Sequence, residues 1–395
     1  MRAGINFKWQ WVVFGLIFQA CGLPIAIETN EAGIQSPIRP VKVAFLYSKT
    51  GSHSFIEKEM RRGADLFISQ SQGALPKIEI DFYDNQGTVT GTLAQLKKIK
   101  EKEISYIVGL SGSEEALTAA QFAEENDMIF LTPLATFSRI SLGKKNTFQL
   151  SANDVLQGAA LARFTHIDLK RKKVLVLINT RSIYSGGLAE GFQTALKEVH
   201  GVSIEKHVSS GHELNLENLK TKIATIKPDL IFISDDILNS AILAKYIHTL
   251  DPLIPFLSGS QFGNDKAMKI LLKEVPKMRV YYATSWSERE NNIENDKFKL
   301  SYREKYGRSL PTPEAALSFD SLQVLAQALL RADTNSNLDR VRYFLEHLIF
   351  GTTQGKISFV SGPTHSPVKD VHIQVSNISS FKFLKTLRTT WKAKP

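Results

Sequence analysis

Apolar positions follow two alternating periods along this chain. Short apolar runs such as Val41–Tyr47 are followed by longer segments, such as Phe55–Gln70, in which apolar residues recur every three or four positions. The first pattern is typical of buried strands and the second of amphipathic helices. Each strand–helix unit spans about 25 residues, a length that suits the right-handed crossovers between parallel strands.

The alternation runs as far as position 150 and then starts again. The first set of predicted elements is strand Val41–Tyr47, helix Phe55–Gln70, strand Ile78–Tyr83, helix Gly91–Glu101, strand Tyr106–Gly109, helix Glu114–Glu125, strand Met128–Thr132 and the short run Phe148–Leu150. The second set is helix Asp154–Phe164, strand Lys173–Ile178, helix Gly186–Val199, strand Ser203–Val208, helix Leu216–Ile226, strand Leu230–Ile233, helix Asn239–Leu250, strands Pro255–Ser258 and Val280–Ala283, helices Asn295–Tyr306 and Pro313–Ala332, and strands Lys356–Phe359 and Val371–Val375.

Two consecutive sets of this kind predict an α/β fold with two doubly wound parallel-sheet lobes. In such sheets a ligand binds beyond the carboxyl ends of the strands. The chemistry of the protein is therefore expected in the loops that follow the strands, namely Ser48–Ser54, Leu110–Ser113, Pro133–Phe137, Asn179–Ser185, Ser234–Leu238 and Gly259–Gly263.

Length and charge narrow the classes of partner. The chain has 395 residues, enough for two domains, and a formal net charge of +10. An excess of this size favours anionic ligands, nucleic acid or an anionic surface. One tight basic run, Lys170–Lys173, precedes a predicted strand and is interpreted as a solvated turn, with a recognition patch as the alternative. No nucleic-acid motif accompanies the run.

The first 39 residues have the pattern of an export signal. Arg2 and Lys8 precede an apolar run, Trp9–Phe18, that is too short to span a bilayer. The segment Leu16–Cys21 resembles a bacterial lipoprotein box, which implies that Cys21 is lipidated; an ordinary signal with an incidental cysteine is the alternative. We therefore expect a signal peptide over 1–20, a tether over 21–39 and a membrane-anchored protein in the periplasm. No later segment is apolar enough for a transmembrane helix.

Motifs of enzymes and metal sites were sought without success. Gly109–Ser113 lacks the last glycine of a nucleophile elbow, and Ile357 follows Gly355-Lys356 where a P-loop needs serine or threonine. The nine histidines show no metal-ligand spacing. With Cys21 as the single cysteine, an intramolecular disulfide is excluded. The sequence therefore predicts a protein without catalytic residues, metal or cofactor.

Several segments together resemble one family. They are Lys49-Thr50-Gly51, Arg62-Gly63-Ala64, Tyr83-Asp84-Asn85, Gly109–Ser113, Thr132-Pro133-Leu134-Ala135-Thr136, Phe148-Gln149-Leu150 with Gln157-Gly158, Tyr184-Ser185-Gly186, and Thr353–Phe359. In this order and spacing they resemble the type I periplasmic binding proteins, in particular the leucine/isoleucine/valine-binding receptors of ABC transporters. The resemblance covers residues 41 to about 376.

The resemblance implies two lobes joined by three hinge crossings, near residues 150, 285 and 352. Lobe one would comprise 40–151 with 285–351, and lobe two 152–284 with 352–395. A small ligand would be held between the lobes and trapped by hinge closure.

The resemblance also implies which residues of lobe one contact the ligand. Ser113 lies at the start of a predicted helix, whose free N–H groups favour an anion. Ala135, through its backbone N–H, and Thr136, through its hydroxyl, match family ligand positions on the next loop. The local alternatives are that Ser111 caps its helix in a capping box and that Thr136 caps a turn.

The candidates from lobe two are less uniform. Tyr184 matches a family tyrosine that covers the ligand, with a half-buried aromatic as the alternative. Where the family usually has a glutamate for the ligand's ammonium group, this chain has Ser260 and Gln261. Asp235 and Asp236 are candidate substitutes, or else N-cap residues of the helix that follows.

Three functions remain open from the sequence. The first is a periplasmic solute-binding protein that captures an amino acid or a related small polar ligand for an ABC importer by hinge closure, without chemistry. The second is an outer-membrane lipoprotein of the same fold that activates a peptidoglycan synthase, with a protein partner in place of the solute. The third is a sensing ectodomain, which the lack of a transmembrane segment disfavours. Ligand identity and oligomeric state do not follow from the sequence.

Overall fold

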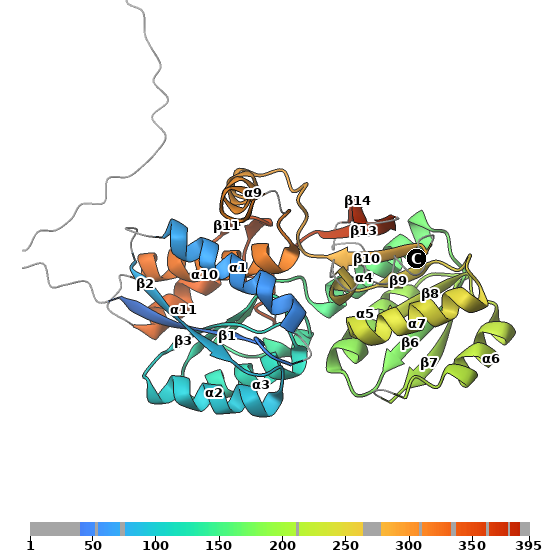
Figure 1. The fold of residues 1–395 in the computed structure, drawn as a ribbon, viewed down its shortest axis with the longest axis horizontal. Helices are drawn as coiled ribbons and strands as arrows, with labels where there is room; N and C mark the ends of the chain where they lie inside the picture. The colour runs from blue at the N-terminus through green and yellow to red at the C-terminus, as the bar shows by residue number, and fades with distance from the viewer. Residues whose placement is uncertain are drawn as a thin grey trace, which may run out of the picture. The chain divides into compact units, whose positions relative to one another are not determined.

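The structure is a computed structural model that describes residues 40–51, 54–71, 76–210, 213–263, 278–307, 310–332, 337–360, 363–377 and 380–387 (Figure 1). The predicted signal peptide, tether and lipidation site Cys21 lie outside the described residues, so these remain predictions. By their internal contacts, the residues from Pro40 onward form one compact unit.

The first sheet has five strands, all parallel to their neighbours. They occur in the order β2-β1-β3-β4-β5, with bounds β1 Val41–Tyr47, β2 Ile78–Asp84, β3 Tyr106–Gly109, β4 Ile129–Thr132 and β5 Thr147–Gln149. The order reverses between β1 and β3, and this reversal is the point at which doubly wound sheets bind ligands.

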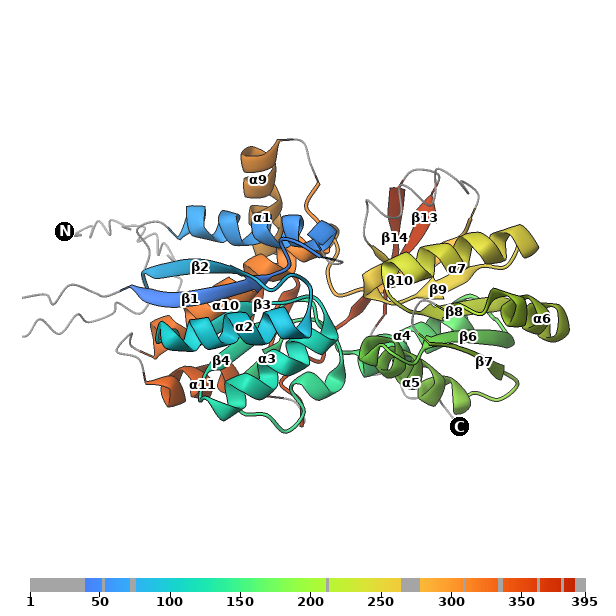
Figure 2. The ribbon, with the colours of Figure 1, turned by 60° about the horizontal axis from the view of Figure 1, so that its bottom comes forward.

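Helices cover both faces of this sheet, because successive strand residues point to opposite sides. Val43 and Phe45 pack with one group of helices, and Ala44 and Leu46 pack with the other. The first group is α1 Ser54–Gln70, α9 Ile293–Tyr306, α10 Pro313–Arg331 and α11 Leu338–His347; the second is α2 Val89–Glu101 and α3 Ser113–Glu125. Figure 2 shows α10 and α11, which come late in the sequence, beside β1–β4.

The second sheet has seven strands in the order β14-β13-β10-β9-β8-β6-β7. Its bounds are β6 Lys173–Asn179, β7 Ser203–Ser209, β8 Leu230–Ser234, β9 Phe256–Ser258, β10 Val280–Thr284, β13 Val371–Asn377 and β14 Ser380–Leu387. The five strands from β10 to β7 are parallel, whereas β13 and β14 are antiparallel additions at one edge.

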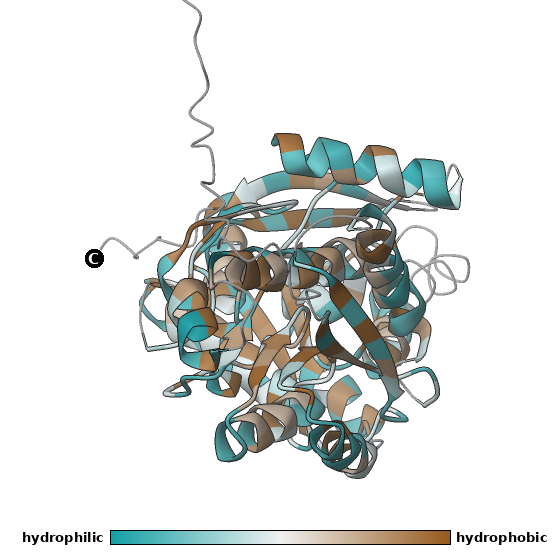
Figure 3. Ribbon diagram, turned by 90° about the vertical axis from the view of Figure 1, so that its left-hand side faces the viewer, coloured by the Kyte–Doolittle hydropathy of each residue, from teal (hydrophilic) through white to brown (hydrophobic). Residues whose placement is uncertain are grey.

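Helices α4 Asp154–Arg163 and α5 Ile183–Lys197 cover one face of the second sheet, and α6 Leu216–Ile226 and α7 Ile237–Leu250 cover the other. In Figure 3 the apolar strands lie between helices that carry hydrophilic stretches. The predicted α/β class with two parallel-sheet lobes is therefore confirmed. From here on, lobe one denotes the first sheet with its helices, and lobe two the second sheet with its helices.

The structure adds elements to those predicted from the sequence. Helix α11, strand β11 Phe350–Thr352 and strand β14 were not predicted, whereas β12 Gly355–Ile357, which pairs with β11, overlaps the predicted strand Lys356–Phe359. Phe350, Ile357 and Phe359 pack in the core of lobe one, so the chain stays with lobe one beyond the crossing expected near 352. The physical reason is the burial of apolar surface. Three large apolar side chains in a short segment pack against α10 and α9 before the chain continues to β13.

Helices α4 and α5 cross with their backbones nearly touching. A Cβ atom added at Gly158 of α4 would lie 2.3 Å from the backbone nitrogen of Phe192 on α5. At Gly186 of α5, by contrast, an added Cβ would meet no atom within 4 Å. The two glycines thus differ in what they do: Gly158 permits helix contact, and Gly186 only adds flexibility.

We predict opposite effects for alanine at these two glycines. Gly158→Ala should lower the free energy of unfolding by about 1–3 kcal/mol, because α4 and α5 must separate. Gly186→Ala should raise it by about 0.5–1 kcal/mol, because alanine costs less backbone entropy in a helix. Urea unfolding followed by circular dichroism measures both, and equal effects would contradict the packing described.

Candidate functional site

A small cavity lies where the loops of the two lobes meet. Ser111 and Leu134 line it from lobe one, Ser260 and Gln261 from lobe two, and Ser285 from the segment between the lobes. Its volume is about 40 Å³, which accommodates only a few water molecules. Sites for organic ligands usually measure about 300–1,000 Å³. An organic ligand would therefore enter only if the lobes move apart.

The three crossings between the lobes are hydrogen-bonded to one another. The N–H of Ala152 in the first crossing donates to Ser285 Oγ in the second, at 3.0 Å. The hydroxyl of Ser366 in the third crossing donates to the carbonyl of Ser151 in the first, at 3.2 Å. Lys369 Nζ in the third crossing donates to the carbonyl of Ser285, at 2.6 Å. These bonds tie the three crossings into one hinge.

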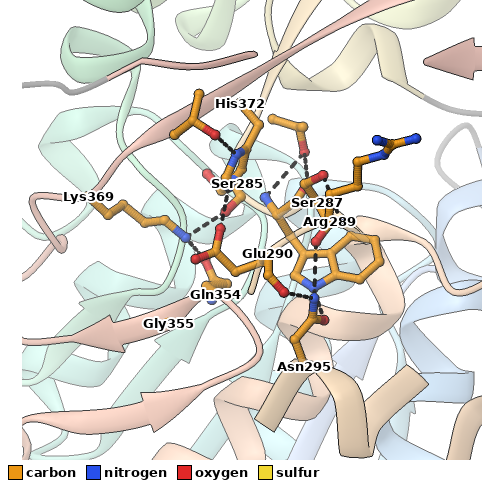
Figure 4. A network of polar contacts seen from close by, with 12 residues as sticks. Ser285, Ser287, Arg289, Glu290, Asn295, Gln354, Gly355, Lys369 and His372 are labelled. Carbon is orange, nitrogen blue, oxygen red and sulfur yellow. Dashed lines mark hydrogen bonds and ion pairs between the residues drawn. The ribbon is translucent and has the colours of Figure 1, made fainter. Parts of the chain in front are cut away.

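Lys369 is the buried cation of this hinge (Figure 4). Its ammonium group also donates to Gln354 Oε1, and Gln354 Nε2 donates to Asp320 Oδ2 at 2.9 Å. Asp320 accepts two further bonds from Thr353, through the backbone N–H and the hydroxyl. One side-chain amide therefore connects a buried amine to a buried carboxylate.

Burial acts on both charged ends of this connection. It lowers the pKa of Lys369 to about 7, with Asp320 and Glu290 opposing the decrease. It raises the pKa of Asp320 to about 6, although the bonds from Thr353 and Gln354 favour the charged form. For both Lys369 and Asp320, burial disfavours the charged form, and the hydrogen bonds to that form offset this desolvation cost only in part.

A second contact joins β13 to the crossing that follows β10. His372 Nε2 lies 3.2 Å from Glu290 Oε2, and His372 Nδ1 lies 3.0 Å from Thr386 Oγ1. The imidazole lowers the pKa of Glu290. Figure 4 shows Glu290 between His372 and the group around Asn295. The antiparallel edge of the second sheet is thereby connected to the hinge.

A buried carboxyl group lies at the point of lobe one where the strand order reverses. Glu57, in the first turn of α1, is 1% exposed. Its Oε1 accepts the hydroxyl proton of Ser111 at 3.0 Å, and the backbone N–H of Ser48 also favours its charged form. Burial nevertheless raises the pKa of Glu57 to about 8. Its Oε2 has no hydrogen-bond partner among the described residues.

A second buried carboxyl group begins helix α4. Asp154 is fully buried, and neither of its carboxyl oxygens has a hydrogen-bond partner in the described part of the chain. Burial raises its pKa to about 8; the nearby Thr136 hydroxyl opposes this, without the geometry of a full hydrogen bond, and Glu114 adds to it. The Asp154 N–H donates to the carbonyl of Thr136 at 2.8 Å, which holds α4 against the loop after β4.

Lobe two carries a third acid at its own reversal of strand order, between β6 and β8. Asp235 Oδ1 accepts from Asn179 Nδ2 at 3.0 Å and from the backbone N–H of Asp236 at 2.8 Å. Burial raises the pKa of Asp235 to about 6. Asp236 caps α7, accepting from the N–H groups of Leu238 and Asn239. In the structure Asp236 therefore acts as the N-cap residue of α7, which is the alternative role that the sequence left open.

The predicted residues of lobe one are buried and do not line the cavity. Ser113, Ala135 and Thr136 are at most 2% exposed, and none is among the residues that line the cavity. Ser113 is the first residue of α3, and its hydroxyl has no hydrogen-bond partner within the described ranges. Ser111 does not cap α3: the N-cap is Gly112, and the Ser111 hydroxyl donates to Glu57 instead. Contact of these residues with a ligand stays a prediction.

The predicted residues of lobe two divide into two groups. Ser260 and Gln261 are half-buried and line the cavity. Tyr184 is 1% exposed and packs in the core of lobe two, with its hydroxyl beside Gly259 and the loop that follows. Burial raises its pKa.

The family model described as "Periplasmic binding protein" matches residues 40–379, most of the chain. The chain belongs to the periplasmic binding protein family. It is therefore a binding protein and not an enzyme, and the resemblance found in its sequence is confirmed.

Individual relatives of this binding protein are distant. The Leu/Ile/Val-binding protein BraC3 of Rhizobium johnstonii is 21% identical over 243 residues, which are 61% of this chain and 64% of that protein. The match thus spans less than two thirds of the relative's length.

Solved structures share the fold of this binding protein. The leucine-binding protein LivK of Thermotoga maritima has a TM-score of 0.82 at 23% identity, over 88% of this chain and 99% of that one. A solute-binding protein of R. palustris in complex with benzoate has a TM-score of 0.76 at 18% identity, over 88% and 96% of the two chains.

Two further observations concern a membrane and a metal ion. None of the helices in the described part of the chain combines the length and apolar character needed to cross a bilayer. Within the same residues, no three His, Cys, Asp or Glu side chains are grouped to hold a metal ion.

Sequence reasoning missed the buried acids Glu57, Asp154 and Asp320 of this binding protein. A signal for them exists in the helical period, since side chains three or four positions apart share a face. Glu57 shares its face with Met60, Ala64 and Phe67, and all four are buried. An acidic residue within an otherwise apolar stripe of a helix is predicted to be buried from its position alone. Lys369 carried no such signal, because it lies in an irregular segment.

We predict that the hinge depends on Lys369. Lys369→Ala should lower the free energy of unfolding of the binding protein by about 3–5 kcal/mol, because it leaves the Ser285 carbonyl and Gln354 without their donor. Lys356→Ala, at an exposed position of β12, is the control and should change it by less than about 0.5 kcal/mol. Similar losses in both variants, measured by urea unfolding, would show that the hinge does not need this amine.

We also predict a pH effect of Asp154. Burial raises its folded-state pKa to about 8, whereas the unfolded chain releases this proton near about pH 4. The folded state therefore keeps the proton, and the resulting stability is present at acidic pH and lost as pH rises through about 8. Asp154→Asn does not titrate. Between pH 5 and 8.5 the wild type should lose stability relative to this variant in urea melts; a constant difference would refute the raised pKa.

Proposed function

We propose that this protein captures a small polar organic ligand, an amino acid or a related molecule, in the periplasm and delivers it to an ABC importer. The observation that carries the proposal is the cavity between the two lobes, lined by residues from both and from the hinge. A ligand there contacts both halves at once, so its binding energy favours the closed arrangement over the open one.

Family membership supports the proposal at its coarser level, since the matched family is one of periplasmic binding proteins. The relatives and structures named above are described as binding leucine, isoleucine, valine or benzoate. None of those descriptions mentions a peptidoglycan synthase. We therefore retain solute capture, with the synthase activator as the outcome that a failed ligand search would favour.

We predict that the purified protein gains thermal stability from its ligand. A compound at a hundredfold excess over its Kd stabilises the folded state by about 2.7 kcal/mol. A thermal-shift screen of amino acids, small aromatic acids and amines should find such a compound. The radius of gyration in small-angle scattering should also fall when that compound is added. A screen without any stabilising compound would contradict solute capture.

We predict in addition that Thr136→Ala weakens binding of the compound so identified without unfolding the protein. The variant keeps the backbone bond from the Asp154 N–H to the Thr136 carbonyl and removes only the hydroxyl, which lies beside the Asp154 carboxyl group at the start of α4. Calorimetry measures the affinity, and circular dichroism checks the fold. Unchanged affinity would show that the position assigned by family resemblance has no part in binding.

A further inference from the structure

Three of the hydroxyl groups that line the cavity donate their protons to the protein and leave their lone pairs for a ligand. Ser111 donates its proton to Glu57, while Ser151 and Thr284 donate theirs to backbone carbonyl groups at 2.7 and 3.2 Å. A hydroxyl has one proton and two lone pairs. Once the proton points into the wall, what remains for a ligand is a pair of acceptor sites.

The charges at the cavity are also of one sign. Glu314 is the charged residue among the described residues that line it, and no lysine, arginine or histidine is found in that lining. Lys369 approaches from behind, but its protons are directed to Ser285 and Gln354. This acidic bias stands against a chain whose formal net charge is +10.

An independent observation is that a buried carboxyl oxygen next to the cavity has no partner. Glu57 Oε2 is buried without a hydrogen bond in the described ranges. Glu57 lies between two wall residues, since Ile56 precedes it and Ser111 is bonded to it. Buried polar atoms are nearly always satisfied, so an unsatisfied oxygen beside a cavity is a candidate contact for a group that enters it.

A ligand carboxylate, by contrast, finds two nearby donors in use. At the strand-order reversal of lobe one, the Ser111 hydroxyl and the Ser48 N–H serve Glu57. The chain's own carboxyl group therefore occupies these two donors, while the Ser113 hydroxyl stays without a partner in the described ranges. A ligand carboxylate beside Glu314 would also meet repulsion in a poorly solvated place.

We propose that the ligand of this cavity is an organic ammonium ion that lacks a carboxylate. Its N–H groups would be accepted by the lining hydroxyls, by Glu314 and by Glu57 Oε2. Its apolar body would pack on Ile56, Leu134 and Leu317, which line the same cavity. The proposal rests on solute capture and names the class of solute.

Three probes that share the 3-methylbutyl group test the class. They are L-leucine, 3-methylbutylamine, which is leucine without its carboxylate, and 4-methylpentanoate, which lacks the amine. Calorimetry and thermal shift should show that the amine binds at least tenfold more tightly than leucine and that the pentanoate does not bind. Tighter binding of leucine or of the pentanoate would overturn the proposal while leaving solute capture intact. No binding of any probe, together with an empty wider screen, would overturn both.

Variants connect the preference to Glu57. Glu57→Ala should weaken amine binding at least tenfold and should let leucine bind more tightly, because it frees the protons of Ser111 and Ser48. Glu79→Ala, at an exposed position of β2, is the matched control and should leave both affinities unchanged. If Glu57→Ala does not fold, Glu314→Gln, with Glu79→Gln as its control, tests the acidic acceptor of the lining. Unchanged amine affinity in the folded variant would refute the role of these acids.

Discussion

The need of every buried polar group for a partner governs this structure. Three crossings bring polar backbone through the contact between two apolar cores, where water is scarce and an unpaired group is costly. The hinge meets this need with side chains placed at a single point. Ser285 accepts the N–H of Ala152 through its hydroxyl, and its carbonyl accepts Lys369. Because one residue is bonded to both other crossings, none of them can shift without disturbing the rest.

The same need is left unmet at two other buried acids, Glu57 beside the cavity and Asp154 at the start of α4. Both are as deeply buried as the hinge charges, yet some of their oxygens have no partner in the described residues. Burial raises the pKa of both carboxyl groups to about 8, since a charged form without a partner is disfavoured. At Glu57 this contrast with the satisfied hinge distinguishes the part that holds the lobes together from the part where we propose that a ligand binds.

Position along a strand places two of the predicted residues at the cavity. Ser260 and Gln261 follow β9 and line the cavity, because parallel strands end at one edge; their contact with a ligand stays a prediction. The burial of Ser113 and Thr136, outside the lining, could not be predicted from the sequence, because a loop's depth depends on what packs over it. Glu57 was overlooked for a related reason: as an acid in a first helical turn it fits an ordinary helix start, and only its apolar stripe indicates burial.

By itself the sequence determined the α/β class, the two parallel sheets and the succession of most strands and helices along the chain. It could do so because the hydrophobic period and the positions of turns are local properties. The tertiary structure alone decided that Phe350 and Ile357 stay with lobe one, that β13 and β14 add to the edge of the second sheet, and that Lys369 meets Ser285. It also decided that the proton of Ser111 points toward Glu57 and away from the cavity. These outcomes depend on contacts between residues far apart in the chain, where the cost of an unpaired buried group exceeds any local preference.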